Sequence, residues 1–300
     1  QAVLAPEETA TFTVQPKAGL SAGDYSGTLT LSGSEGSQVS LGVSYVVEKG
    51  QAAVTDVPRA KTLTYTGSAQ ALLTEGEATG GTLVYSLEQD GEYTTAIPTG
   101  TNAGEHSVYY KVQGDKDHND TEPVEVTVTI AKADPKVTAP VPVTGLTYTG
   151  EEYELITAGT TTGGTLVYSL DENGEYTDTI PTGTAAQSYT VWYKVQGNEN
   201  YNDTEAASVT AVIGNALAEV TEAPEANTLT YTGQAQALVT AGEATGGDMM
   251  YRLGDSGDFS ADIPTGTNAG DYSVWYKVVG DENHSDTDPV EVKITIAKAT

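Results

Sequence analysis

The stretch EHSVYYKV, residues 105–112, decides the fold. Side chains at alternate positions of an extended strand point to opposite faces, so this stretch has two sets of residues. One set is His106, Val108, Tyr110 and Val112, and the other is Ser107, Tyr109 and Lys111. The segment VEVTVTI, residues 124–130, alternates in the same way, and Val, Thr and Tyr favour strands. No segment shows a sustained apolar period of 3.6 residues, so the sequence predicts strands and almost no helix.

Working outward, the same pattern returns at a constant spacing of 83 residues. The motifs LTYTG, IPTGT and YKV each occur three times, and they begin at Leu63, Leu146 and Leu229, at Ile97, Ile180 and Ile263, and at Tyr110, Tyr193 and Tyr276. Solenoid repeats usually run roughly 20–50 residues, so a longer unit can be a small domain in its own right. Short strands separated by Gly, Asn, Asp and Pro are typical of an immunoglobulin-like (Ig-like) β-sandwich. The predicted fold is all-β, with tandem Ig-like sandwiches arranged as beads on a string.

The spacing also predicts the domain boundaries. We define repeat 1 as residues 51–133, repeat 2 as residues 134–216 and repeat 3 as residues 217–300. Short junctions with Pro and small residues separate them, as linkers should. Residues 1–50 do not hold a whole unit, although AGDYS at 22–26 matches AGDYS at 269–273. We expect this segment to be the C-terminal part of a truncated Ig-like domain, and the chain to be a monomeric fragment of a larger protein.

Composition excludes several classes of function. The chain has 42 acidic and 13 basic residues, for a formal net charge of −29. Nucleic acids and anionic membrane surfaces bind basic proteins, so neither is an expected partner. Cysteine is absent, which excludes disulfides, thiolate metal sites and cysteine nucleophiles. No apolar run is long enough to span a bilayer and no signal peptide is recognisable, so we expect no membrane insertion.

The motifs together resemble a known family. LTYTG, GGTLVYSL, IPTGTNAG and VEVTVTIAKA are similar to Ig-like repeats of large surface proteins from Gram-positive, gut-dwelling Firmicutes. Residues 10–31, ATFTVQPKAGLSAGDYSGTLTL, are similar to another Ig-like module of such proteins. The resemblance covers essentially the whole chain, and repeat 2 departs from it at TAAQ (184–187) and AVIGNA (211–216). It implies an extracellular location at the cell surface or cell wall of a Gram-positive bacterium.

The resemblance leaves several functions open. Such repeats serve as wall-anchored stalks, as adhesive domains for host glycans or proteins, or as accessory modules beside glycosidases. Some surface proteins of this kind bind host immunoglobulins. We expect a non-catalytic fragment that binds a host protein, possibly an immunoglobulin, or a mucin-type glycan. A passive stalk and a non-catalytic accessory region of a secreted glycosidase remain the alternatives.

The sequence contains no recognisable catalytic motif and only a weak candidate for a metal site. The histidines are His106, His118 and His284, and none belongs to a recognisable nucleophile, zinc or phosphate motif. We therefore expect no enzyme activity and no cofactor. The hairpin loop GDKDHNDT, residues 114–121, places Asp115, Asp117 and Asn119 at alternate positions, as an EF-hand does. The Gly and Glu that an EF-hand loop requires are missing, so these residues are only weak candidates for Ca²⁺ at a junction between domains.

The outward face of the deciding strand carries the candidate partner-binding residues. Tyr109, Trp192 and Trp275 share one outward position, and the strand at 80–87 is its expected neighbour. Each repeat is then predicted to show a flat patch of one aromatic, one aliphatic and one lysine side chain. In repeat 3, GGTLVYSL becomes GGDMMYRL at 246–253, which contains both methionines and one of two arginines. Met and Arg are enriched at protein interfaces, so the predicted partner-binding residues are Tyr109, Trp192, Trp275, Met250, Arg252 and Lys277.

Three further interpretations concern the same strand. Aromatic residues can stack on a sugar or anchor a protein, but they can also simply shield the sheet through packing between strands. Tyr189 and Tyr272, the first aromatics of the strand, predict tyrosine corners, with His106 in the altered corner of repeat 1. An isopeptide crosslink would need Lys111, Lys194 or Lys277 near Asn102 or Asn268, whereas the alternation turns these lysines outward into solvent.

Overall fold

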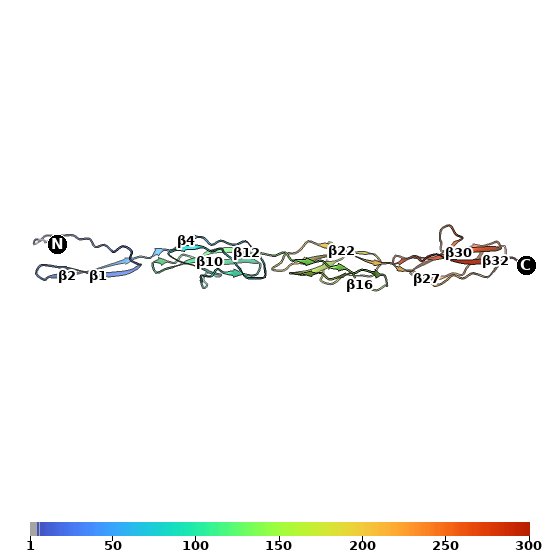
Figure 1. Cartoon of the computed structure of the whole chain (residues 1–300), viewed down its shortest axis with the longest axis horizontal. Helices are drawn as coiled ribbons and strands as arrows, with labels where there is room; N and C mark the ends of the chain where they lie inside the picture. Colours follow the sequence, from blue (N-terminus) through green and yellow to red (C-terminus); the bar gives the residue numbers. More distant parts are fainter. Residues whose placement is uncertain (1–4, 6) are drawn as a thin grey trace. The chain divides into compact units, whose positions relative to one another are not determined.

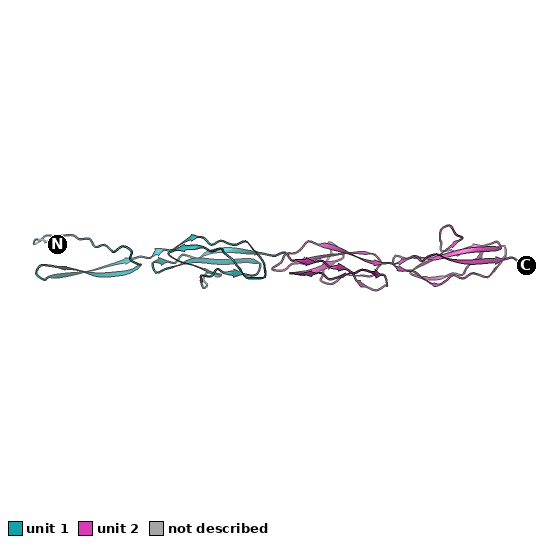
Figure 2. Ribbon diagram, viewed as in Figure 1, with its two compact units in different colours: residues 1–133 teal, residues 134–300 magenta. Residues whose placement is uncertain are grey.

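The computed structural model describes residue 5 and residues 7–300. Among the described residues there are strands, turns and loops but no helix, so none that could cross a membrane. The predicted all-β class is confirmed. The chain forms two compact units, residues 1–133 and 134–300, which Figure 2 colours separately. The predicted domain boundaries, 50/51, 133/134 and 216/217, stay predictions.

In the first unit, repeat 1 folds around a four-stranded sheet in the order β5, β12, β10, β8, of which β10 and β12 are labelled in Figure 1. These strands are β5 (Leu63–Thr64), β8 (Gly81–Ser86), β10 (Gly104–Gly114) and β12 (Val124–Ala131). Strand β10 pairs antiparallel with both β8 and β12, and β5 joins the far side of β12 in parallel. The shorter pairs are β4 (Ala53–Asp56) with β7 (Glu77–Thr79) and β6 (Gln70–Ala71) with β9 (Thr99–Gly100).

The second unit contains the same arrangement twice. In repeat 2 the sheet is β15 (Leu146–Thr147), β22 (Ala207–Gly214), β21 (Ser188–Gln196) and β19 (Thr165–Ser169). Its short pairs are β13 (Val137–Thr138) with β18 (Thr160–Thr161), β14 (Val141–Pro142) with β17 (Ile156–Thr157) and β16 (Tyr153–Glu154) with β20 (Thr182–Gly183). In repeat 3 the sheet is β25 (Leu229–Thr230), β32 (Val290–Ala297), β30 (Gly270–Gly280) and β28 (Gly247–Leu253). Its short pairs are β24 (Glu219–Glu222) with β27 (Glu243–Thr245) and β26 (Gln236–Ala237) with β29 (Thr265–Gly266).

Each repeat has a hydrophobic core of its own. The inward valines of β10, β21 and β30, which are Val108, Val191 and Val274, are all 0% exposed. They pack against a leucine from the segment after LTYTG, which is Leu72, Leu155 or Leu238. Burying such side chains is the main favourable term in folding. The residues of EHSVYYKV that are predicted to share one face therefore do so, and that face is the one that points into the core.

The first fifty residues contain one described hairpin, β1 (Gly23–Ser32) with β2 (Gln38–Val47). Its register places Tyr25 opposite Tyr45, just as β30 and β32 place Tyr272 opposite Ile294. The rings of Tyr25 and Tyr45 stack at 5.4 Å, but further along the same face Val39 is 65% exposed. The register supports the relation to the repeats, whereas the truncated domain itself stays a prediction. Residues 1–4 and 6 of that segment lie outside the described residues.

The predicted tyrosine corners are present where each main strand begins. Tyr272 Oη donates to Asn268 O at 2.8 Å, and Tyr189 Oη donates to Ala185 O at 3.0 Å. In repeat 1, His106 Nε2 takes the place of the hydroxyl and lies 2.9 Å from Asn102 O. Tyr25 makes the same bond to Ser21 O, at 2.9 Å. The corner fixes the turn before the strand, so that turn is held in the same way in all four places.

Candidate interaction surface

The two strands of the predicted face are neighbours in all three repeats. In the sheet register Tyr109 lies opposite Ser86, Trp192 opposite Ser169 and Trp275 opposite Arg252. The adjacent inward residues on the strands, such as Tyr110 and Tyr85, are buried in the core. The three aromatic residues therefore lie on the side of the sheet away from the core, as the alternation predicts.

The flat patch predicted on this face is wrong for repeats 1 and 2. Val84 and Val167, the expected exposed aliphatic side chains, are only 3% and 4% exposed. The segment after β8 turns back and pairs with it through two hydrogen bonds between Tyr85 and Thr94, of 2.7 and 2.9 Å. The ring of Tyr93 in this segment lies beside Lys111, the register partner of Val84, and so takes up this part of the face. Residue 93, next to this bridge, is Tyr in repeat 1, and its equivalents are Tyr176 and Phe259. We call these returning segments, residues 87–96, 170–179 and 253–262, the straps.

The strap ring lies beside the lysine of the main strand in every repeat. Lys111 Nζ is 4.9 Å from the ring centre of Tyr93, Lys194 Nζ 4.2 Å from that of Tyr176, and Lys277 Nζ 5.4 Å from that of Phe259. A cation held over an aromatic face is attracted by the ring quadrupole. These lysines point away from the core as predicted, but they are not the freely solvated side chains that the alternation suggested.

Carboxylates complete the lysine contacts in repeats 1 and 3. Lys111 lies 3.5 Å from Asp120, and Lys277 donates to Asp286 Oδ2 at 2.6 Å. The Lys277 hydrogen bond, followed by the Gly280 N–H, holds the pKa of Asp286 below its usual value. Lys111 also lies seven residues along β10 from Gly104, or roughly 23 Å at the usual strand rise. Asn102 precedes Gly104 in the corner, so Lys111 and Asn102 are too far apart for an isopeptide bond.

Repeat 3 differs from the other two repeats on this face. Arg252 Cζ lies 4.7 Å from the ring centre of Phe259 and 5.9 Å from that of Trp275. Trp275 Nε1 donates to Asp255 Oδ1 at 3.1 Å. Met250 pairs with Lys277 in the register and is half-buried on the same side, whereas Met249 packs against the core. We call Met250, Arg252, Phe259, Trp275 and Lys277 the repeat 3 face.

In repeats 1 and 2 a serine stands opposite the outward aromatic residue, where repeat 3 has Arg252. Trp192 and Tyr109 are half-buried beside the small Ser169 and Ser86, whose hydroxyls accept the N–H of the residue two positions on. Burial raises the pKa of Tyr109, and the charge and hydrogen bond of Glu125 raise it further. Of the six predicted partner-binding residues, the structure brings Trp275, Met250, Arg252 and Lys277 together. Tyr109 and Trp192 lie in other repeats.

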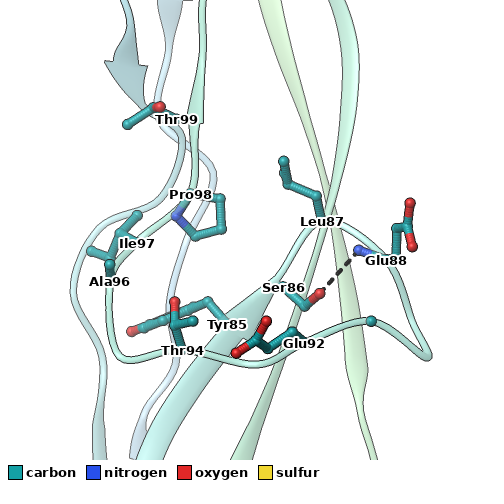
Figure 3. Close-up of a pocket in the computed structure, with 11 residues that line it drawn as sticks. Tyr85, Ser86, Leu87, Glu88, Glu92, Thr94, Ala96, Ile97, Pro98 and Thr99 are labelled. Carbon is teal, nitrogen blue, oxygen red and sulfur yellow. Dashed lines mark hydrogen bonds between the residues drawn. The ribbon is translucent and has the colours of Figure 1, made fainter.

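A hollow that the sequence did not predict lies beside the strap of repeat 1. Figure 3 shows it between the end of β8 and residues 91–99, with Tyr85, Ser86 and Pro98 among the eleven residues that line it. Its volume is about 580 Å³. The Ser86 hydroxyl accepts the Glu88 N–H at 3.2 Å, as the dashed line shows. Glu88 and Glu92 also line it, so the hollow combines acidic side chains with apolar ones such as Leu87 and Ile97.

The weak calcium candidates lie in the loop between β10 and β12. Asp115 Oδ1 is 2.7 Å from His118 Nδ1 and accepts the Asp117 N–H at 2.9 Å, contacts that hold the Asp115 pKa below its usual value. Asp117 Oδ1 accepts the Ala22 N–H at 2.8 Å, which lowers the Asp117 pKa. Asn119 is the exposed last residue of β11 (His118–Asn119). Among the described residues, no group of three or more His, Cys, Asp or Glu side chains could hold a metal ion.

In repeats 1 and 3 this loop contacts the preceding segment of the same unit. In unit 1, the Asp117 side chain bonds Ala22, next to the corner of the hairpin, while Asp117 O accepts the Gly50 N–H at 2.8 Å. In unit 2, Asn283 Oδ1 accepts the Ala186 N–H at 2.8 Å and Asn283 O accepts the Ala216 N–H at 3.0 Å. We call these two sets of contacts the joints. In both joints the loop contacts the segment that precedes its repeat.

A short parallel strand pair accompanies each joint. β3 (Gly50–Gln51) pairs with β11, and β23 (Ala216–Leu217) pairs with β31 (His284–Ser285). In the second joint the rings of Tyr148 and His284 meet edge to face at 5.2 Å. The histidines therefore take part in local structure: His106 in a corner, and His118 and His284 in the loops of the joints.

Comparison with protein-family models gives no match, and comparison with curated protein sequences gives none either. Among solved structures, the chain is similar to Sidekick-1 immunoglobulin domains 1–5, with 14% identity, a TM-score of 0.33, and coverage of 92% of this chain and 66% of that one. It is similar to Drosophila N-cadherin EC1–4, with 11% identity, a TM-score of 0.29, and coverage of 92% and 83%. A Bacteroides ovatus protein of a mixed-linkage glucan utilization locus, SGBP-B, gives 14% identity, a TM-score of 0.24, and coverage of 83% and 71%. At such TM-scores none of them carries an argument about the ligand of this chain.

Proposed function

We propose that this chain is a non-catalytic part of an extracellular bacterial surface protein, and that its Ig-like repeats display the repeat 3 face to a host protein. The observation that carries the proposal is the cluster around Arg252, in which a guanidinium lies over two aromatic rings beside Met250. Trp, Arg, Met and Phe are the residue types enriched at protein interfaces, and Trp and Arg dominate binding hot spots. Repeats 1 and 2 lack this combination of residues, so in this proposal repeat 3 alone contacts the host protein.

The polar groups of the face favour a protein over a neutral glycan. Trp275 Nε1 is already bonded to Asp255, and Lys277 to Asp286. A neutral sugar is recognised through several hydrogen bonds to its hydroxyls from groups spread around the ring, whereas the donors left on this face are mainly those of one guanidinium, Arg252. Host immunoglobulins are the first proteins to test, because the family that the sequence resembles includes immunoglobulin binders.

A stalk is the second candidate function, and the joints favour it. Both joints bond a side-chain oxygen of the loop to a backbone N–H beside the preceding corner, and both add a short parallel strand pair. Such repeated contacts restrict motion between neighbouring parts of a unit. In that case the repeats would hold a binding domain in another part of the protein away from the cell surface.

Binding of the whole chain to immobilised immunoglobulins and to mucin tests the proposal. The variants are Trp275→Ala, the double variant Met250→Ala with Arg252→Ala, and Trp192→Ala as a matched control from repeat 2. We expect saturable binding to an immunoglobulin that the two repeat 3 variants reduce at least tenfold and the control leaves unchanged. Binding that survives in all the folded variants would move the site elsewhere, and no binding to either ligand would favour the stalk.

A further inference from the structure

Arg252 replaces a small buried residue of the other repeats. Ser86 and Ser169 stand at its position and are 6% and 8% exposed. Each serine hydroxyl accepts a backbone N–H at the start of its strap. Arg252 is partly exposed instead, and its Nε donates to Gly254 O at 3.2 Å. The substitution therefore replaces a buried local hydrogen bond with a cation that reaches the surface.

The guanidinium is held in position but has no acidic partner in the described part of the chain. One hydrogen bond and the rings of Phe259 and Trp275 fix its plane. None of the ion pairs there includes Arg252, although the sequence has 42 acidic residues. Lys277, the other cation of the face, is paired with Asp286. The terminal nitrogens of Arg252 keep the forked geometry that carboxylates bind.

We propose that the repeat 3 face binds a protein partner through one Asp or Glu side chain that stands among apolar residues and pairs with Arg252. This deepens the proposed function and rests on it. We infer that the partner's carboxylate has apolar neighbours because Met250, Phe259 and Trp275 surround the guanidinium with apolar surface. We infer a single carboxylate and not an acidic cluster because this chain has a net charge of −29 and would repel a strongly acidic partner.

The two tryptophans of the chain allow a direct test on the full-length protein. Labelling with 5-fluorotryptophan gives one fluorine signal beside Arg252, from Trp275, and one control signal from Trp192. The probes are the blocked peptide acetyl-Leu-Glu-Leu-amide, its Gln analogue and 3′-sialyllactose, each titrated to about 50 mM, above the millimolar Kd expected of one such contact. We expect the Glu peptide to shift the Trp275 signal saturably and the Trp192 signal not at all. The Gln peptide should bind at least tenfold more weakly.

Variants separate the role of Arg252 from a general effect on the face. Arg252→Ser restores the residue of repeats 1 and 2 and should abolish the shift, whereas Arg252→Lys should weaken binding several-fold because the planar fork is lost. Equal binding of the Glu and Gln peptides, or no shift with either, would overturn the proposal. Tighter binding of sialyllactose than of the Glu peptide would also overturn it, in favour of an acidic glycan.

The outcome is distinguishable from that of the proposed function. If an immunoglobulin binds and Trp275→Ala reduces binding while Arg252→Ser does not, the proposed function stands and the carboxylate contact is refuted. If the Glu peptide binds at Arg252 but no host protein tested does, the carboxylate site stands and the immunoglobulin assignment falls. Loss of immunoglobulin binding in Arg252→Ser, together with the peptide result, supports both.

Discussion

At the scale of single residues, the glycine of IPTGT is required by space and not by its backbone angle. Gly100, Gly183 and Gly266 are buried, and none has a positive φ. A Cβ on Gly183 would lie 2.6 Å from Cζ of Tyr189, the ring of the corner. The recurrence of this glycine is visible in the sequence, but the ring that excludes a side chain there becomes visible only once the corner is folded.

Gly183→Ala should therefore destabilise repeat 2 by about 1–3 kcal/mol, as expected of an overpacked core. Urea unfolding of the full chain, with hydrogen exchange to assign the repeat, measures the loss. The matched control is Gly214→Ala in the same repeat, where a Cβ would meet only Leu146 O, at 3.5 Å. Equal stability of the two variants would contradict the steric explanation.

The corner hydrogen bond gives a second prediction at this scale. Tyr272→Phe removes the bond to Asn268 O and keeps the ring, so repeat 3 should lose about 1 kcal/mol. His106→Tyr in repeat 1 is the reciprocal change, and it should keep a bond to Asn102 O and leave stability within about 1 kcal/mol. Unfolding midpoints of both variants check this pair. A Tyr272→Phe protein as stable as the wild type would show that the hydroxyl is dispensable.

At the scale of elements, the sequence predicts the pairing of β8 with β10 and the outward phase of their residues, because a period of two fixes both faces. It does not predict the straps, because a segment such as LEQDGEYTTA reads as a polar loop. One signal was available: the aromatic residue at 93, 176 and 259 recurs with the repeat spacing. The contact between Arg252 and Phe259 could not be inferred, because it depends on how the strap folds back over β28.

The pairing of β30 with the following loop makes repeat 3 sensitive to acid. The Lys277 hydrogen bond holds the pKa of Asp286 below its usual value in the folded state. A carboxyl with a depressed folded-state pKa stabilises the fold above its unfolded-state pKa of about 3.9, and this contribution is lost as the pH falls through the folded-state value. Asp286→Asn should therefore make unfolding of repeat 3 less dependent on pH below about pH 4. The control is Asp248→Asn, an exposed carboxyl on β28.

At the scale of the whole molecule, the repeat length predicts where neighbouring repeats meet, and the loop at 114–121 is expected at such a junction. The atoms of the joints were not predictable, because Asp117 in one joint becomes Asn283 in the other. Both side chains offer an oxygen that accepts a backbone N–H, so the change preserves the bond. The sequence had suggested calcium for this loop, whereas in the structure the Asp117 side chain bonds a backbone N–H of the preceding segment.

Asn283→Ala should loosen the second joint, because the Ala186 N–H loses its acceptor. A loss of about 1 kcal/mol lowers the ratio of closed to open joints roughly fivefold. Asn283→Asp keeps the acceptor, as Asp117 does, and should behave as the wild type. Glu282→Ala, which changes an exposed neighbouring side chain, is the control. Nitrogen-15 relaxation measurements of repeats 2 and 3 show whether the two repeats tumble together, as a closed joint requires, or separately. If Asn283→Ala leaves the two repeats coupled, the strand pair β23–β31 and the Tyr148–His284 contact hold the joint without the side chain.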